Sequence, residues 1–376
     1  MTLGLIHLPL VGYFGAISGL ASLVVPGIVR AKQTRGSVLF LALAAASLVA
    51  TWTYMGLYFR RSFLDAARER GVAPAAFETR EWLTDVSLFH EAWHYVCATA
   101  ARYWWSEQLM YWTTGPLAIL MSVEGRRRGV KLLWVYMLLG QIVAVSFAQS
   151  LFFAALALVP RVAPRAPSGG RPLGPPAGQT WQLLAAVVLG AIGTTLVPAR
   201  VETGEFLPLL VAIHVVAVVP LVDSVLPDWR VRLPPSRLYF NYAFIALRLR
   251  WATVAQLVDV AYVAQAPVRR ILPAVKSLFV AEWQVLNSHP AQASISWDVV
   301  CATLSAVAFC VYDNATEPES ELVVPYELVA LLVVATPVVG LQSTVAMYLA
   351  VREGKRESFE QKLRHQLEDD KDHKKD

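Results

Sequence analysis

The chain has 376 residues, of which 56% are hydrophobic and 16% are charged, and its mean hydropathy is +0.47. One water-soluble core cannot bury so much apolar surface, so the composition excludes an ordinary soluble domain and predicts a polytopic membrane protein in a lipid bilayer. The net charge of +5 reflects loops between apolar runs, and the basic residues are not interleaved with a soluble binding face. We therefore expect no nucleic-acid partner.

The apolar runs predict an all-α bundle of eight or nine transmembrane helices. Each run is near the roughly 20 residues that a helix needs to cross a bilayer, and none alternates as a barrel strand does. The eight runs are 5–29, 37–58, 106–123, 131–159, 181–198, 207–226, 296–313 and 322–350. A ninth candidate, 239–263, carries Arg248, Arg250 and Asp259, so it either crosses or lies along the interface.

Basic residues predict the orientation of the bundle. The first run has no basic leader but is followed by Arg30, Lys32 and Arg35, which indicates a retained helix and not a cleaved signal. Two crossings further on, a second basic group occupies 126–131, so both groups share one side. That side is expected to be cytosolic, which places the amino terminus in a lumen or outside the cell.

Residues 1–351 are expected to form one transmembrane bundle. The segment 160–180 is rich in proline and glycine and should be an exposed connector. Residues 352–376 mix acids and bases with almost no apolar stripe, which predicts a solvent-exposed tail. The three cysteines lie in apolar segments without ligand spacing and are expected to be core residues: Cys97, Cys301 and Cys310.

Residues 82–101 predict an amphipathic helix at the membrane surface. Its apolar side chains form one narrow stripe, made of Trp82, Val86, Phe89, Trp93, Val96 and Ala100. Within it, His90, Glu91 and His94 spell H-E-x-x-H, in which two histidines hold zinc and the glutamate is general base. No third ligand follows at a recognised spacing, so a zinc metalloprotease is the alternative, and surface histidines are the simpler interpretation.

Three carboxylates are the candidate catalytic residues, because ionisable groups at membrane depth are costly and usually functional. Glu107 shares a helix face with Trp104, Tyr111 and Thr114, and this face is expected to point into the bundle. Burial there would keep a carboxylic acid protonated and able to donate. The competing interpretation is a glutamate that reaches the interface or bonds a neighbouring helix.

The other two candidates are Asp298 and Asp85. Asp298 shares an otherwise apolar helix face with small polar residues, and Asp85 flanks the stripe of the amphipathic helix. Either could instead be an amino-terminal helix charge that the helix dipole favours. Glu124 precedes three arginines, so an ion pair that fixes the loop explains it without catalysis. Gln141 could bond across helices or orient a catalytic acid.

Buried acids among aromatic rings suit the protonation of an isoprenoid. An acid activates an alkene or epoxide, a carbocation travels along the chain, and aromatic faces stabilise it away from water. The expected lining of this path comprises Trp104, Trp105, Tyr111, Trp112, Gln141 and Trp297. A transporter or lipid-binding protein would also place acids inside a bundle, but no internal repeat is visible in the chain.

Five blocks of the sequence resemble a family of fungal integral-membrane terpene cyclases from meroterpenoid clusters, of the ascochlorin, ascofuranone and macrophorin type. They are TWTYMGLYFRRSF, REWLTDVSLFHEAW, WWSEQLMYWTTG, EGRRRGVKLLWVYMLLGQIVAVSFAQSLF and SHPAQASISWDVV. The resemblance runs from about residue 3 to 351. It implies a metal-independent cyclase without a cofactor, acting on a farnesylated aromatic or quinone substrate at the endoplasmic reticulum. At matching positions, the polar residues within the resembling blocks are Asp85, Glu124, Gln141 and Asp298.

A shorter block, SEQLMYWTTGPLAIL, is similar to one helix of the emopamil-binding sterol isomerases, where a buried acid protonates a ring alkene. This resemblance implies a proton donor on the 106–123 helix, which points again to Glu107.

Overall fold

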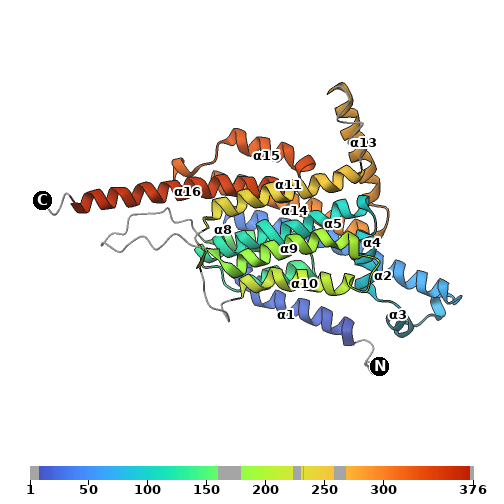
Figure 1. Cartoon of the computed structure of the whole chain (residues 1–376). Coiled ribbons are helices and arrows are strands. Elements are labelled where there is room, and N and C mark those ends of the chain that lie inside the picture. The colour runs from blue at the N-terminus through green and yellow to red at the C-terminus, as the bar shows by residue number, and fades with distance from the viewer. Residues whose placement is uncertain (1–7, 160–178, 223–229, 232, 258–267, 373–376) are drawn as a thin grey trace.

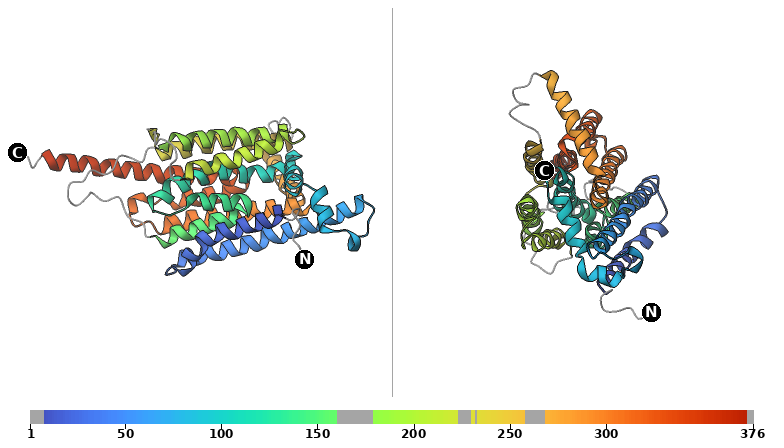
Figure 2. Two further views of the ribbon diagram at one scale, coloured as in Figure 1. Left: turned by 90° about the horizontal axis from the view of Figure 1, so that it is seen from below. Right: turned by 90° about the vertical axis from the view of Figure 1, so that its right-hand side faces the viewer.

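The structure, a computed structural model, describes residues 8–159, 179–222, 230–231, 233–257 and 268–372. It confirms the all-α fold: the helices lie side by side in one elongated bundle (Figures 1 and 2). Within the part of the chain that the structure describes, the exception is a two-residue antiparallel pairing of β1 (Gln179–Thr180) with β2 (Arg230–Val231). Most of the predicted connector at 160–180 lies outside the described residues.

Two landmarks orient the bundle in Figure 1. One end is marked by the carboxy-terminal helix, which extends well beyond its neighbours, and is called the tail end. The other is marked by α13 (Val268–Leu286), which projects away from the bundle, and is called the α13 end.

Among the described residues, five helical segments are long and apolar enough to cross a membrane, so the chain is an integral membrane protein. They cover Leu10–Arg30, Arg35–Glu69, Trp181–Arg200, Pro290–Ala315 and Ser320–Val339. Exposed apolar side chains on these helices, such as Val188, Leu304 and Val334, suit contact with lipid tails. The predicted eight or nine separate spans are not confirmed.

Seven elements of the described chain run between the two ends. They are α1 (Leu8–Arg30), α2 (Arg35–Glu69), α5 (Ala100–Trp112) with its continuation, α9 (Trp181–Arg200), α10 (Phe206–Val218) with η5 (Val219–Leu221), α11 (Pro235–Leu257) and α14 (Pro290–Ala315). The continuation of α5 comprises η3 (Thr113–Leu117), α6 (Ala118–Leu120) and η4 (Met121–Gly125), in which η3 and η4 are π-helical turns. Every residue from 103 to 125 is buried, so this element is the centre of the core.

The predicted span over 131–159 is wrong, because the chain turns back inside the bundle. α7 (Leu133–Ile142) and α8 (Val145–Leu158) are separate helices that pack against each other. Arg128 donates to the Leu156 carbonyl at 3.2 Å, and Thr34 donates to that of Ala157 at 3.2 Å, so α8 ends where α7 begins, at the tail end. At 1.5 Å per residue α8 is about 21 Å long, too short to cross a hydrocarbon core of about 30 Å.

The tip of this hairpin is stabilised by side chains from three other helices. A broken helix in a bilayer exposes backbone groups that lipid cannot satisfy. Tyr13 and Trp52 donate to the carbonyl oxygens of Ile142 and Val143, at 2.5 and 3.3 Å. The two oxygens of Asp298 accept from the backbone N–H groups of Val145 and Ser146, at 2.9 and 2.8 Å. Asp298 therefore caps the amino terminus of α8, not of its own helix α14.

We expect Asp298→Asn to lower the stability of the protein. An asparagine amide retains one accepting oxygen, so one backbone N–H at the start of α8 would lose its partner, at a cost of about 1–3 kcal/mol. Thermal unfolding of the purified protein in detergent measures this loss. Asp65→Asn, at an exposed ion pair with Arg61 and Arg68, is the control and should change stability by less than about 1 kcal/mol. Equal melting temperatures for the two variants would contradict the capping role.

The predicted span over 322–350 is also two helices, α15 (Tyr326–Val339) and α16 (Leu341–Asp372). The Asn314 side chain bonds both the N–H and the carbonyl of Val324, at 2.8 and 3.0 Å, so α15 starts beside the end of α14, at the tail end. A short 3₁₀ turn, η6 (Ser320–Leu322), precedes α15 in the chain. After α15, α16 runs back to the tail end (Figure 1). Thr336 and Thr344 are hydrogen-bonded across the turn at 2.9 Å. The chain therefore forms a second hairpin that enters and leaves from one end. Ser320–Val339 is apolar and long enough to span by composition, but its continuous helix α15 has only 14 residues, about 21 Å.

Gly340 forms the turn of the second hairpin. Its φ of 93° and ψ of 145° lie in a region that residues other than glycine strongly disfavour. An added Cβ would also lie 2.7 Å from the Gln342 amide oxygen. We expect Gly340→Ala to cost about 1–3 kcal/mol, measured by thermal unfolding in detergent. Gly354→Ala within α16, where the nearest atom to an added Cβ is 3.8 Å away, should be neutral or stabilising.

The predicted amphipathic helix over 82–101 is wrong as a single element. The chain forms η2 (Pro74–Ala76), α3 (Thr79–Asp85) and α4 (Leu88–Cys97), and Val86 between the last two is extended. The Trp82 end of the stripe is buried, whereas Phe89 is 48% exposed. A separate helix, α5, begins after Thr99, whose hydroxyl accepts from the Arg102 N–H. Helix breaks at Val86 and Thr99 therefore divide the predicted stripe.

Candidate functional site

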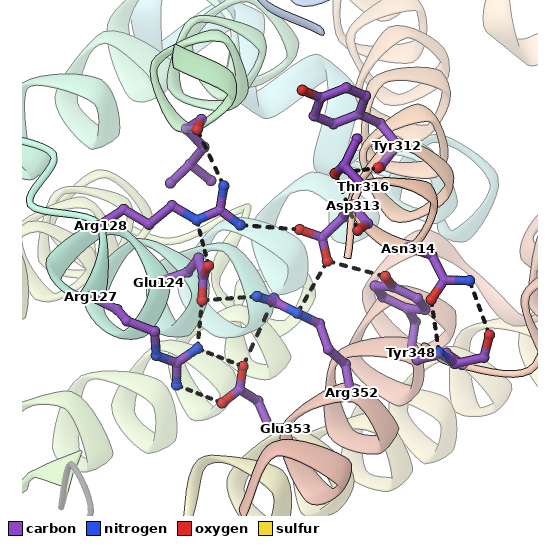
Figure 3. Close-up of polar contacts among 12 residues, drawn as sticks. Glu124, Arg127, Arg128, Tyr312, Asp313, Asn314, Thr316, Tyr348, Arg352 and Glu353 are labelled. Carbon is purple, nitrogen blue, oxygen red and sulfur yellow. Dashed lines mark hydrogen bonds and ion pairs between the residues drawn. The ribbon is translucent and has the colours of Figure 1, made fainter. Parts of the chain in front are cut away.

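The arginines that follow Glu124 form a buried charge network at the tail end (Figure 3). Glu124 pairs with Arg127 and Arg128 at 2.5 and 2.6 Å, as predicted, and also with Arg352 at 2.9 Å. Arg352 pairs with Asp313 at 3.1 Å. Glu353 completes the network through Arg127 at 2.7 Å.

This network has three acidic and three basic side chains, so its formal charges balance. It joins η4, the end of α14 and α16, and Tyr348 adds a hydrogen bond to Asp313 at 3.1 Å. Arg352 and Glu353 are 6% and 1% exposed, so the predicted solvent-exposed tail at 352–376 begins too early: its first two residues are part of the core. The network is a clamp between helices.

A second polar cluster lies nearer the α13 end, and we call it the Arg250 cluster. It comprises Trp104, Glu107, Arg250, Thr253 and Glu282. Arg250 donates to Glu107 Oε1 at 2.8 Å, and Thr253 donates to Glu107 Oε2 at 2.5 Å. The same guanidinium nitrogen, Nη1, donates to the Trp104 carbonyl at 2.8 Å. The guanidinium carbon lies 4.0 Å from the Trp104 ring centroid, a cation–π contact.

The Arg250 cluster contains polar atoms with no hydrogen-bond partner among the described residues. They are Arg250 Nε and Nη2, Trp104 Nε1 and Glu282 Oε2. Arg250 and Glu107 are fully buried, and Glu282 is 2% exposed. Buried polar atoms are nearly always paired, because leaving one unpaired costs about 1–3 kcal/mol. Four such atoms in one cluster therefore point to a polar occupant.

Glu282 is the carboxyl group of this cluster that forms no ion pair in the described chain. It belongs to α13, which is outside the membrane-spanning helices, and Trp105 donates to its backbone carbonyl at 3.1 Å. One turn earlier, Phe279 contacts Trp104 edge to face, with ring centroids 6.4 Å apart. Burial raises the pKa of Glu282 to about 7; Arg250 opposes the shift and Glu107 adds to it. A substantial share of Glu282 is therefore protonated at neutral pH.

The structure separates the three predicted acids. Glu107 belongs to the Arg250 cluster, Asp298 caps α8, and Asp85 pairs with Arg70 at 2.6 Å on a half-exposed surface. Within the described residues, neither Asp85 nor Asp298 makes a polar contact with the cluster. Only Glu107 therefore combines burial with aromatic neighbours and unpartnered polar atoms.

Of the six predicted lining residues, Trp104 belongs to the Arg250 cluster, and Trp105 donates to the backbone carbonyl of Glu282 in that cluster. Three others bond elsewhere: Tyr111 to Thr195, Trp112 to Gln149, and Gln141 to the His214 carbonyl. The sixth, Trp297, has an indole N–H without a partner in the described chain.

Sequence reasoning did not select Arg250 and Glu282 as site residues. Arg250 was visible as a charge in the ninth apolar candidate, 239–263. Glu282 is the one acid between 264 and 297, beside Trp283. The signal for both was an isolated charge in an apolar setting, but their proximity depends on how α11 and α13 pack against α5.

The H-E-x-x-H residues do not assemble a metal site in the described chain. His94 Nε2 lies 3.0 Å from Glu202, and the rings of His90 and His94 are stacked 5.9 Å apart. No group of three histidine, cysteine or acidic residues is arranged to hold a metal ion among the residues described. The geometry thus gives the metalloprotease alternative no further support.

The hollows of the described chain include one at the surface and one between helices. The first lies on α10 and is wholly apolar, from Leu207 to Val216. The second lies between α14, α15 and α16, where Thr336 and Thr344 line it together with apolar side chains. Neither of these hollows is lined by a residue of the Arg250 cluster.

Comparison with known protein families gives a match to part of the chain. The family described as "Protein of unknown function DUF2834" is similar to residues 238–354, less than a third of the chain. The matched segment contains Arg250, Glu282, Asp298 and Arg352. No curated protein and no solved structure matches the chain.

Proposed function

We propose that the protein is a membrane-bound terpene cyclase that protonates an epoxide or alkene of a prenylated aromatic or quinone substrate and closes its rings through carbocations. The resemblance of the five sequence blocks motivates this activity and a location in the endoplasmic reticulum. The observation that carries it is Glu282, a buried carboxyl group in the Arg250 cluster with an oxygen that has no partner in the described chain. The Trp105 indole donates to its backbone carbonyl, and Phe279, one turn earlier on α13, contacts the Trp104 ring.

In the proposed reaction Glu282 replaces the predicted acids as proton donor. Both carboxylate oxygens of Glu107 are already engaged, one by Arg250 and the other by Thr253, whereas Glu282 keeps an oxygen without a partner in the described chain. The Glu282 proton passes to the epoxide oxygen, the C–O bond breaks, and the electron pair remains on that oxygen. A neighbouring alkene supplies two electrons for the new C–C bond. A base removes one proton at the end, so the reaction is an isomerisation.

The aromatic rings and the Arg250 cluster have complementary roles in this scheme. Trp104 and Trp105 present π-electron faces that stabilise a passing cation. Their burial keeps out water that would quench it. Glu107 holds Arg250 in place, so the cation path carries no unpaired guanidinium charge.

Product formation tests the proposal directly. Membranes that contain the protein would be incubated with farnesylated phenols and quinones and with their terminal epoxides, and products would be identified by mass and chromatography. Cyclised isomers of unchanged mass support the proposal. Unchanged substrates across the whole panel, from folded protein, contradict it.

A transporter is the second candidate, and the two hairpins are the observation that favours it. Broken helices within a bilayer often surround a transported substrate. Both hairpins enter from the tail end. The hairpins of inverted repeats would instead enter from opposite sides, so this arrangement is not that of an inverted-repeat transporter. Uptake of labelled farnesylated phenol into proteoliposomes without chemical change would select this candidate.

A further inference from the structure

The packing of α11 against α16 fixes which residues lie at the same depth. The Ser236 N–H donates to Glu357 at 3.0 Å, and Gly354 packs against Ser236. The two helices run in opposite directions from this point. Arg250 lies 14 residues after Ser236 and Ser343 lies 14 residues before Glu357. At 1.5 Å per residue both are about 21 Å from the contact, so they lie at one level.

The facing positions agree with this register. Residues on one face of a helix recur at three- and four-residue steps. On α11 such steps lead from Ser236 to Arg250, and on α16 they lead from Glu357 back to Ser343. Every intermediate position on these two tracks is buried, as are Arg250 and Ser343. The buried residues are Tyr239, Ala243, Ala246 and Arg250 on α11, and Ser343, Ala346, Ala350 and Glu353 on α16. The small alanine side chains allow the two helices to approach closely.

The polar atoms at this level complement one another as a recognition site. Ser343 Oγ and both amide atoms of Gln342 are buried and have no partner in the described chain. The same holds for Arg250 Nε and Nη2, which form one edge of the guanidinium. Two parallel N–H groups on such an edge match the two oxygens of a carboxylate, or an acidic phenol with a neighbouring carbonyl.

We propose that the free edge of Arg250, with Ser343 and Gln342 at the tip of the α15–α16 hairpin, binds the acidic oxygen group of a lipophilic molecule that enters from the bilayer. The group is a carboxylate or an acidic phenol. The farnesyl tail of this molecule is taken from the proposed function, on which the inference rests to that extent. The head-group site itself is tested by binding, without a measurement of product.

The hairpin supplies the route of entry. Thr336 and Thr344 line the hollow between α14, α15 and α16 and lie one turn from the tip at Gly340. α15 is weakly buried, with Leu331 and Val334 63% and 76% exposed, so few packing contacts oppose its displacement. Binding displaces the Gln342 amide from Gly340 and gives it a new partner.

The test measures binding to the full-length protein in lipid nanodiscs by calorimetry. Four probes share a farnesyl tail: a benzoic acid, its methyl ester, a phenol with an ortho carbonyl group, and its methyl ether. We expect the acid or the phenol to bind at least about tenfold more tightly than its methylated form, the value of one charge-assisted hydrogen bond. If only the benzoic acid binds more tightly than its methylated form, the head group is a carboxylate. If only the phenol does, the head group is a phenolate.

Variants locate the site. Ser343→Ala removes a hydroxyl that has no partner in the described chain, so it should weaken binding by about threefold to tenfold without lowering the melting temperature. Arg250→Lys keeps the charge beside Glu107 but removes the flat edge, and should reduce the preference over the methylated probe. Ser47→Ala, a buried serine on α2 that bonds Ala44, is the control and should leave binding unchanged.

Equal binding of methylated and free probes, or no binding of any probe, would overturn the proposal, as would unchanged binding by folded Ser343→Ala and Arg250→Lys proteins. Product formation is measured separately on the same preparations. A protein that cyclises methylated and free substrates equally well would therefore refute the head-group site and leave the proposed function intact.

Discussion

Glu282→Gln should reduce product formation by at least about 100-fold, because an amide cannot replace a general acid, which typically contributes 10²–10⁴. The substitution preserves size and leaves the Arg250–Glu107 ion pair in place. It should therefore change the melting temperature little. The measurement is initial rate in membranes with matched amounts of protein.

The pH dependence provides a second check on the same residue. The pKa of Glu282 is raised to about 7 by burial, so its proton-donating form predominates below pH 7. The rate should therefore fall as pH rises through about 7, and the Glu282→Gln protein should lack this decline.

A matched control separates chemistry from general damage. Glu81→Gln, on the exposed surface of α3 beside Arg70, should retain full activity. If Glu282→Gln were active and Glu107→Gln inactive although folded, Glu107 would be the proton donor and the assignment of Glu282 would be wrong.

Arg352→Met should destabilise the protein by about 3–5 kcal/mol, the usual cost of breaking a buried ion pair by removing one partner. Arg352 contacts both Glu124 and Asp313, and its removal leaves two buried carboxylates short of a partner. We expect little monodisperse protein after extraction in detergent. Gel filtration and thermal unfolding measure the loss.

Two further variants test whether charge balance is the cause. Arg356→Met, one turn along α16, removes an i,i+4 pair with Glu360 and should cost about 0.3–0.5 kcal/mol. Adding Asp313→Asn to Arg352→Met removes one of the two carboxylates and should recover part of the stability. A double variant less stable than Arg352→Met alone would contradict this explanation.

Hydrophobic runs predicted the class of the protein well, because a 20-residue apolar segment has few stable environments other than a bilayer. They could not distinguish a full crossing from a hairpin. The runs 131–159 and 322–350 are long enough for one span, and their turns are marked only by an unexceptional Val143 and by Gly340. Contacts between distant residues, such as Arg128 with Leu156, establish the return.

For the acidic residues too, the sequence predicted one property and the tertiary structure decided another. That Asp298 and Glu107 are buried could be predicted, since each lies on a helix with apolar surroundings. Their roles could not, because a carboxylate that caps a neighbouring helix and one that pairs with an arginine look alike in sequence. Asp298 acquires its role from the start of α8, 153 residues away, and Glu107 from Arg250, 143 residues away.

The sequence by itself determined an all-α membrane protein, the side shared by its two basic groups and the pairing of Glu124 with the arginines that follow it. These properties depend on local hydropathy and on charges within one turn of helix. The tertiary structure alone decided that two apolar runs are hairpins, that Arg250 and Glu282 lie beside Glu107, and that Ser343 is level with Arg250. Those arrangements follow from helix packing and register, which bring together residues that no sequence period connects.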